Sequence, residues 1–223
     1  MQSLSLVFDV GSTLIHPNFE TLTKWVREKT GHSASVIAVE RAFRIAVSGD
    51  LFSKLHEGVV FFERCGVSEL DTDTRRKYWS EIETAGGDNS WLYTVVDEEA
   101  KPTLQRLKEL NVNLIAASNS DGSLDSELRS YDLLSYFDQT YDSTQLGVEK
   151  PSYQFYEHVI SDKHADRYIH IGDDFINDFV GPMASGFDQA YLIDPASIYS
   201  RLPRNMFLSS LSDLCDLVER RIR

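Results

Sequence analysis

The sequence predicts an α/β fold: a Rossmann-like parallel sheet core with an inserted helical cap domain. From about residue 93 onward, short apolar runs alternate with amphipathic helical patterns, which is typical of a parallel sheet with right-handed crossovers. Another apolar run, at 4–10, stands apart from that series because residues 17–92 carry mainly helical patterns. The expected domains are therefore a core of residues 1–16 and 93–223 and a cap of residues 17–92.

The first predicted elements are one strand and a set of cap helices. Residues 4–10, LSLVFDV, are mainly apolar and end in a charge, as expected of a buried strand that reaches the edge of a sheet. In the cap, Leu22 and Val26 lie on one face of a first helix, and residues 71–82 form a later one. The apolar stripe of the helix between them consists of Val36, Val39, Phe43 and Val47.

The core continues as alternating strands and helices. Strands are expected at 112–118, 137–143, 167–174 and 189–194. Helices are expected over Pro102–Leu110, over 123–131 and from Pro151 onward. Two more are expected, one carrying Ile176, Phe179 and Met183 and one around Leu211, Leu214, Cys215 and Val218.

Composition excludes several classes of function. The formal net charge of −13 repels phosphate backbones, so we expect no nucleic-acid partner. No apolar run approaches the roughly 18 residues of a membrane-spanning helix, so we expect no membrane partner. Cys65 and Cys215 do not form a disulfide framework, which favours a reducing, cytoplasmic location.

Polar side chains collect where the predicted strands end. In open parallel sheets, ligands bind beyond the carboxyl ends of the strands, so these side chains are expected to converge on one site. The residues concerned are Asp9, Ser118, Asn119, Lys150, Asp173, Asp174 and Asp178.

This set has a chemical interpretation. Carboxylates packed together repel one another unless a cation intervenes, and oxygen-only ligands suit Mg²⁺. With Lys150 present, such a site can hold the phosphate of a small phosphorylated molecule. Asp9 can then attack phosphorus as a nucleophile, as carboxylates do when an aspartyl-phosphate forms.

Four segments that contain these residues follow one another along the chain: FDVGSTL, LIAASNS, GVEKPSYQFY and HIGDDFINDFVGPMASGF. In this order they resemble the four motifs of the haloacid dehalogenase-like (HAD) hydrolase superfamily. The resemblance covers essentially the whole chain and is greatest to the dehalogenase-like branch with a type-one helical cap. It implies a Mg²⁺-dependent hydrolase, and a phosphatase in particular.

The resemblance also implies roles for single residues at the metal. Asp9 is implied as both the nucleophile and a metal ligand, and Gly11 as a ligand through its backbone carbonyl. Asp173 is implied as a Mg²⁺ ligand, and Asp178 as a helper that acts directly, through water or through Lys150.

At the substrate, the resemblance implies four more roles. Thr13 would orient the turn after the nucleophile, Ser118 and Asn119 would hold phosphoryl oxygens, and Lys150 would pair with Asp9 and the phosphate.

Gly11 departs from the family pattern. Phosphatases of the family carry a second aspartate at this position, which protonates the leaving group and then activates water. Loss of such an acid/base costs about 10²–10⁴-fold. His16, Asp121 or a cap residue are candidates to replace it.

Two alternative functions follow from Gly11. One is a weakly catalytic or non-catalytic phosphate-binding protein with a regulatory role. The other is a 2-haloacid dehalogenase-type enzyme, because those enzymes also lack the second aspartate, although their fourth motif lacks the metal-binding pair that Asp173 and Asp178 preserve here.

Overall fold

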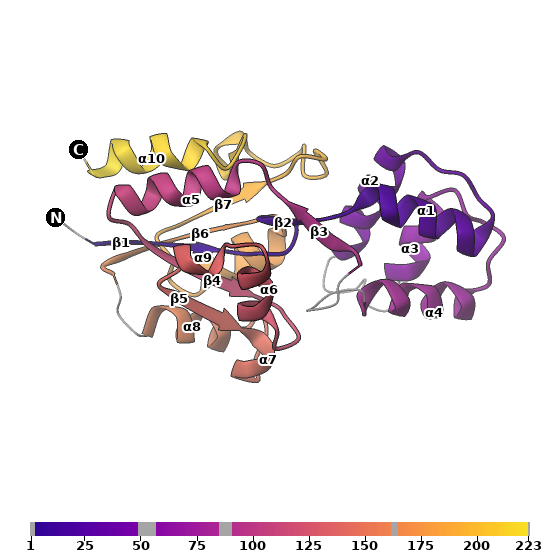
Figure 1. Cartoon of the computed structure of the whole chain (residues 1–223), viewed down its shortest axis with the longest axis horizontal. Helices are drawn as coiled ribbons and strands as arrows, with labels where there is room; N and C mark the ends of the chain where they lie inside the picture. Colours follow the sequence, from indigo (N-terminus) through magenta and orange to yellow (C-terminus); the bar gives the residue numbers. More distant parts are fainter. Residues whose placement is uncertain (1–2, 49–56, 85–90, 162–164, 223) are drawn as a thin grey trace. The chain divides into compact units, whose positions relative to one another are not determined.

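The computed structural model describes most of the chain. The described residues are 3–48, 57–84, 91–161 and 165–222. They cluster into two compact units (Figure 1). The core unit comprises Met1–His16, Val96–Pro195 and Arg201–Arg223, and the helical unit comprises Pro17–Val95 and Ala196–Ser200.

A six-stranded parallel sheet forms the centre of the core unit, with the strand order β5-β4-β1-β6-β7-β8. The strands are β5 (Gln139–Asp142), β4 (Asn113–Ser118), β1 (Leu4–Phe8), β6 (Arg167–Gly172), β7 (Gln189–Ile193) and β8 (Phe207–Leu208). The predicted α/β fold with a Rossmann-like sheet is confirmed. The short edge strand β8 was not predicted, because two residues are too few to show the alternation of apolar and polar side chains that marks a strand.

β1 lies between β4 and β6 and is buried along nearly its whole length. Phe8 is in register with Ala116 of β4 and with Ile171 of β6, so three adjacent strands end close together. β1 stops at Phe8, two residues earlier than expected, and Asp9 is therefore the first residue beyond the strand.

Helices connect and cover these strands (Figure 1). They are α5 (Ala100–Glu109), α6 (Leu124–Ser130), α7 (Ser143–Leu146), α8 (Tyr153–Ser161), α9 (Gly181–Ala184) and α10 (Asp213–Ile222), with the 3₁₀ turns η1 (Leu134–Tyr136) and η3 (Arg204–Met206). The helix expected from Pro151 begins two residues later, at Tyr153. Among the described residues, no helix is both long and apolar enough to cross a membrane.

The segment after β6 differs from the prediction. It forms a π-helix, η2 (Phe175–Val180), before α9 begins. A π-turn holds more residues than an α-turn, so the side chains that follow are rotated relative to α-helical spacing. In this segment the Asp178 side chain is buried, whereas Met183 is 39% exposed.

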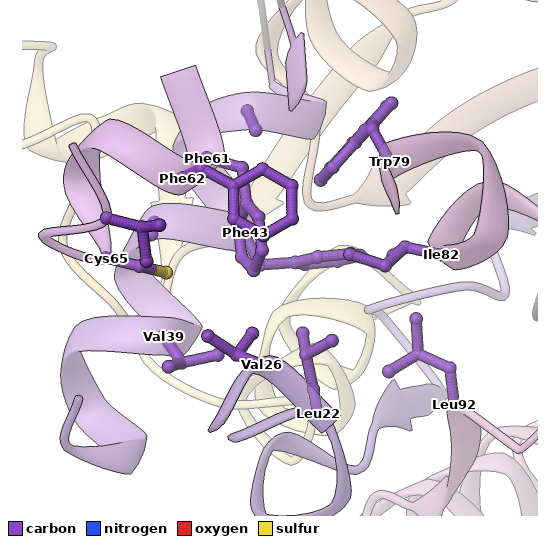
Figure 2. Close-up of a cluster of buried hydrophobic side chains, with 13 residues drawn as sticks. Leu22, Val26, Val39, Phe43, Phe61, Phe62, Cys65, Trp79, Ile82 and Leu92 are labelled. Carbon is purple, nitrogen blue, oxygen red and sulfur yellow. The ribbon is translucent and has the colours of Figure 1, made fainter. Parts of the chain in front are cut away.

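The helical unit contains α1 (Phe19–Thr30), α2 (Val36–Val47), α3 (Glu57–Arg64) and α4 (Thr72–Glu83). Their buried side chains form one cluster, which includes Leu22, Val39, Phe43, Phe61 and Trp79 (Figure 2). Val36 and Val47 are exposed, contrary to the predicted stripe, because they lie at the two ends of α2.

The chain passes between the two units in two short strands, β2 (Ile15–Pro17) and β3 (Tyr93–Val96), which pair with each other. Asn18 then caps α1 by accepting a hydrogen bond from the Thr21 N–H. Gly31 ends that helix in the left-handed conformation, with φ at 71°.

Candidate active site

The candidate site lies at the carboxyl ends of β4, β1 and β6. Ser118 is the last residue of β4, Asp9 follows β1, and Asp173 follows β6. The Asp9 N–H donates to the Ile171 carbonyl at 2.8 Å, which continues the sheet hydrogen bonding one residue past β1. The sheet register therefore fixes the backbone position from which the Asp9 side chain projects.

A buried lysine joins two carboxylates in this site. Lys150 Nζ donates to Asp9 Oδ1 at 2.7 Å and to Asp178 Oδ1 at 2.7 Å. The Lys150 and Asp178 side chains are each 2% exposed, so little water screens the contact. Asp178 Oδ2 also accepts the Asp174 N–H at 3.0 Å, which holds the carboxylate at both oxygens.

The pKa values of the two carboxylates are shifted in opposite directions. Burial raises the pKa of Asp9 from 3.8 to about 6, because lost solvation outweighs the attraction of Lys150 and the Asp178 charge adds repulsion. Burial also acts to raise the pKa of Asp178, but Lys150 and His170 outweigh it and hold this pKa well below its usual range. At neutral pH Asp178 is thus ionised, and of the two carboxylates Asp9 is the one that binds a proton more readily.

Lys150 remains protonated in this setting. Burial acts to lower its pKa, but the charges of Asp178 and Asp9 together raise that pKa above its usual range. The ammonium therefore offers a fixed positive charge beside the Asp9 oxygens.

Three carboxylates converge here with a donor set that fits a hard cation. One oxygen from each of Asp9, Asp173 and Asp178 lies within 4.8 Å of the other two. Three acidic groups exceed the single charge of Lys150, and oxygen-only ligands of this kind suit Mg²⁺. The residues present therefore fit the ion that the sequence predicts.

Asp174 is not part of that group. Its carboxylate accepts the Asn177 N–H at 2.6 Å and caps the π-helix. Burial, aided by repulsion from Asp178, raises the pKa of Asp174 to about 6. The structure thus places this residue in a capping position.

Two hydroxyls also contact the Asp9 carboxylate. Thr13 Oγ1 donates to Asp9 Oδ2 at 3.3 Å, and Ser118 Oγ donates to Asp9 Oδ1 at 3.4 Å. The structure brings both predicted residues to the nucleophile candidate. The predicted contacts of Ser118 with phosphoryl oxygens stay a prediction.

Asn119 is engaged with the Lys150 backbone. Its Nδ2 donates to the Lys150 carbonyl at 3.0 Å, and its Oδ1 accepts the Lys150 N–H at 2.8 Å. The side chain therefore holds the loop that presents the lysine. Its predicted contact with a phosphoryl oxygen stays a prediction.

The turn after Asp9 is tight and internally bonded. The Val10 carbonyl accepts the N–H groups of Thr13, Leu14 and Ile15. The left-handed residue of this turn is Ser12, with φ at 62°, and Gly11 is not among the described glycines with positive φ. Position 11 therefore places no backbone restriction on a side chain.

A sequence model of the haloacid dehalogenase-like hydrolases matches residues 5–180. The chain belongs to this family. One relative, haloacid dehalogenase-like hydrolase domain-containing protein 3 of Homo sapiens, is 26% identical over 121 residues, which are 52% of this chain and 48% of the human protein. The match thus spans about half the length of that curated relative.

Solved structures share the fold of the whole chain. A 2-haloacid dehalogenase from Pseudomonas syringae pv. Tomato DC3000 is 20% identical, with a TM-score of 0.57 over 99% of this chain and 100% of that one. A HAD phosphatase from Thermococcus onnurineus is 18% identical, with a TM-score of 0.59 over 98% of both chains. The HAD hydrolase YfnB of Bacillus subtilis, bound to magnesium, is 17% identical, with a TM-score of 0.62 over 98% of this chain and 100% of that one. At these identities the likeness establishes the HAD fold.

Two candidates to replace the acid/base that HAD phosphatases carry at position 11 have other partners. His16 Nε2 lies 2.9 Å from Asp97 Oδ2, and its Nδ1 is buried without a hydrogen-bond partner among the described residues. Asp121 Oδ1 accepts hydrogen bonds from the N–H and hydroxyl of Ser123, at 3.2 and 2.5 Å, in an exposed turn. Neither contact involves Asp9.

Sequence reasoning missed one site residue of this HAD core. His170 lies within the strand predicted at 167–174 and was assigned no role; it is fully buried, and its Nε2 lies 2.9 Å from Asp178 Oδ1. The available signal was its position two residues before Gly172, on the same face of β6. A Cβ at Gly172 would lie 2.2 Å from the Asp178 Cγ, so only glycine leaves room for this carboxylate.

Proposed function

We propose that the chain is a Mg²⁺-dependent HAD-type phosphatase that acts on a small phosphorylated metabolite through an aspartyl-phosphate on Asp9. The observation that carries the proposal is the buried Asp9 carboxylate, held by Lys150 next to the acidic group formed with Asp173 and Asp178. A nucleophile, a fixed cation and a metal-binding donor set thus occupy one end of the sheet.

Mg²⁺ would be held by Asp9, Asp173 and Asp178, with the Gly11 carbonyl as a further ligand. When bound, the ion neutralises charge between the carboxylate and the anionic phosphoryl group. Among the structural relatives, YfnB of Bacillus subtilis is bound to magnesium, which supports this assignment.

The chain's own residues supply the positioning. Asp9 attacks phosphorus, the P–O bond to the leaving group breaks, and the phosphoryl group becomes attached to the Asp9 carboxylate. Lys150 and Ser118 lie on the Asp9 oxygen Oδ1, where they would balance the charge of the transferred group. Water then attacks the aspartyl-phosphate, which releases phosphate and restores the carboxylate.

Gly11 sets the expected range of substrates. Without a carboxylic acid at this position, the leaving group must depart as an anion or take its proton from solvent. Acyl and aryl phosphates, whose leaving groups are stable anions, are therefore expected to react much faster than alkyl monoesters. The same absence slows the attack of water, so the aspartyl-phosphate is expected to accumulate.

A phosphate-release assay with Mg²⁺ tests the proposal across acetyl phosphate, p-nitrophenyl phosphate, and sugar and nucleoside monophosphates. We expect turnover of the activated substrates that disappears in Asp9→Asn. Turnover that survives in Asp9→Asn would contradict the proposed nucleophile. Halide release from 2-haloacids, with no phosphate release from any substrate, would favour the dehalogenase alternative.

The variant Gly11→Asp tests the explanation of substrate range. Because position 11 has no left-handed backbone, it can take a residue with a side chain, and the new carboxyl group would supply the missing acid/base. We expect alkyl monoester hydrolysis to rise by about 10²-fold or more, with a smaller change on p-nitrophenyl phosphate. Gly11→Asn is the matched control and is expected to give no such rise.

A further inference from the structure

His170 occupies an unusual position for a polar side chain. It lies inside β6, is 0% exposed, and packs edge-on against Tyr156 and Phe187, with ring centroids 6.1 and 5.8 Å away. A buried polar group costs free energy unless it is hydrogen-bonded. Its partner is the Asp178 carboxylate, at 2.9 Å.

The contacts define the protonation pattern of the ring. An ionised carboxylate only accepts hydrogen bonds, so the proton lies on His170 Nε2 and is donated to Asp178 Oδ1. His170 Nδ1 is buried and meets no hydrogen-bond partner in the described part of the chain, so a second proton there would have no acceptor. The ring is thus expected to be the neutral Nε2–H tautomer.

We propose that His170 is a positioning residue that holds the Asp178 carboxylate, and through it the Lys150 ammonium, in place for metal binding and for Asp9. This inference rests on the proposed function, because it assigns Asp178 and Lys150 to the same HAD site.

The need for such a group follows from how Lys150 is shared. Its ammonium donates to both Asp9 and Asp178, so a change of charge at Asp9 acts on the contact between Lys150 and Asp178 as well. His170 donates to Asp178 only and is fixed by a central strand of the sheet. Together with the Asp174 N–H, which binds Asp178 Oδ2, it keeps the Asp178 carboxylate in place when the Lys150 ammonium moves.

Two amide variants separate this role from simple packing. Glutamine places its amide near the position of the histidine Nε2, whereas asparagine reaches only the position of Nδ1. His170→Gln therefore retains the donor to Asp178, while His170→Asn and His170→Leu remove it. His158→Leu is the control, since His158 is exposed on α8.

The test is the Mg²⁺ concentration that gives half of the metal-induced rise in melting temperature, measured for each variant. Loss of an outer-shell partner typically weakens metal binding by about 10–100-fold. We expect that loss in His170→Leu and His170→Asn, with His170→Gln and His158→Leu within about threefold of the original protein. Equal affinities in all variants, or His170→Gln as weak as His170→Leu, would overturn the inference.

A second readout needs neither metal nor turnover. Nitrogen-15 NMR of the side chain, assigned by the signal lost in His170→Gln, reports the tautomer directly. A neutral ring with a slowly exchanging Nε2–H supports the inference, and an Nδ1–H tautomer overturns it. If the original protein shows no Mg²⁺ response, the proposed function fails, and the NMR result alone decides the role of His170.

Discussion

At the scale of single residues, Asp9 and Asp178 share Lys150 yet have opposite effects on stability. The folded pKa of Asp9, about 6, lies above its unfolded value of 3.8, so the folded state binds the proton more tightly between those values. Its contribution therefore weakens the fold as pH rises through that window. Asp178 has a depressed pKa, so it stabilises the fold above about pH 4, and this contribution is lost as pH falls further.

Removing each charge at pH 7 without metal is expected to shift stability in opposite directions. Asp9→Asn should raise the free energy of unfolding by about 1–3 kcal/mol, because it removes a carboxylate that is costly to ionise. Asp178→Asn should lower it by about 3–5 kcal/mol, because it breaks a buried ion pair. Urea unfolding measures both changes. Shifts of the same sign would contradict the charge assignment.

Gly172 is expected to tolerate no side chain. A Cβ there would meet the Asp178 carboxyl group at 2.2–2.4 Å, so Gly172→Ala should displace this side chain and weaken Mg²⁺ binding. The overpacking should cost about 1–3 kcal/mol of stability. Gly31→Ala is the comparison: nothing lies within 4 Å of a Cβ there, but its φ of 71° makes the substitution destabilising outside the site, so it controls for loss of stability alone. Mg²⁺ titration of melting temperature is the measurement. Equal affinity in both variants would refute the packing role.

At the scale of elements, the buried Asp142 carboxylate accepts backbone hydrogen bonds near the starts of two helices, α6 and α7. Asp142 Oδ2 accepts the N–H groups of Gly122 and Leu124, and its Oδ1 accepts those of Thr144 and Gln145. These four bonds tie the turn after β4 to the start of α7. Asp142 thereby holds the segment that follows Ser118.

Asp142→Asn is expected to lower the free energy of unfolding by about 1–3 kcal/mol, because an amide can accept hydrogen bonds at only one of the two oxygen positions. Asp216→Asn, whose side chain is 75% exposed, should leave stability unchanged. Denaturant unfolding of the two variants and the original protein measures these free energies. A similar effect of the two substitutions would show that the four backbone bonds contribute little.

The elements also show where sequence reasoning succeeds. A continuous apolar run such as β4, and an amphipathic segment such as α4, can be recognised from the order of apolar and polar residues alone. The π-helix was missed because one extra residue per turn over six residues is too short a change to be read from the apolar pattern. His170 was placed correctly in a strand, but its partner lies eight residues away and depends on the folded turn.

At the scale of the whole molecule, each unit has its own hydrophobic core. The cluster of Leu22, Phe43, Phe61 and Trp79 lies within the helical unit, whereas a separate cluster around Phe155 and Val159 belongs to the core unit. Stability is therefore expected to be separable between the units.

Phe61→Ala should lower the stability of the helical unit by about 3–5 kcal/mol, because it leaves a cavity at a fully buried position. Hydrogen exchange is expected to rise across α1 to α4 while the strands β1, β4 and β6 stay protected. Val159→Ala is the reciprocal variant, and it should raise hydrogen exchange in the core unit while α1 to α4 stay protected. A uniform rise in exchange over both units would contradict separate stability.

The order of motifs along the chain was enough to predict the fold and to gather Asp9, Lys150 and the acidic residues at one sheet edge, because parallel strands bring their ends together. The partners of individual side chains could not be predicted. Asn119 binding the Lys150 backbone, and Asp174 capping a helix, depend on loop geometry that sequence spacing does not encode.

The most direct test of the central claim is acid-quenched mass spectrometry of the protein mixed with acetyl phosphate and Mg²⁺. The account predicts one added phosphoryl group on the peptide that contains Asp9, absent from Asp9→Asn and reduced in Gly11→Asp, where water attack is faster. Phosphate release with no modified Asp9, or a phosphoryl group on another residue, would contradict it.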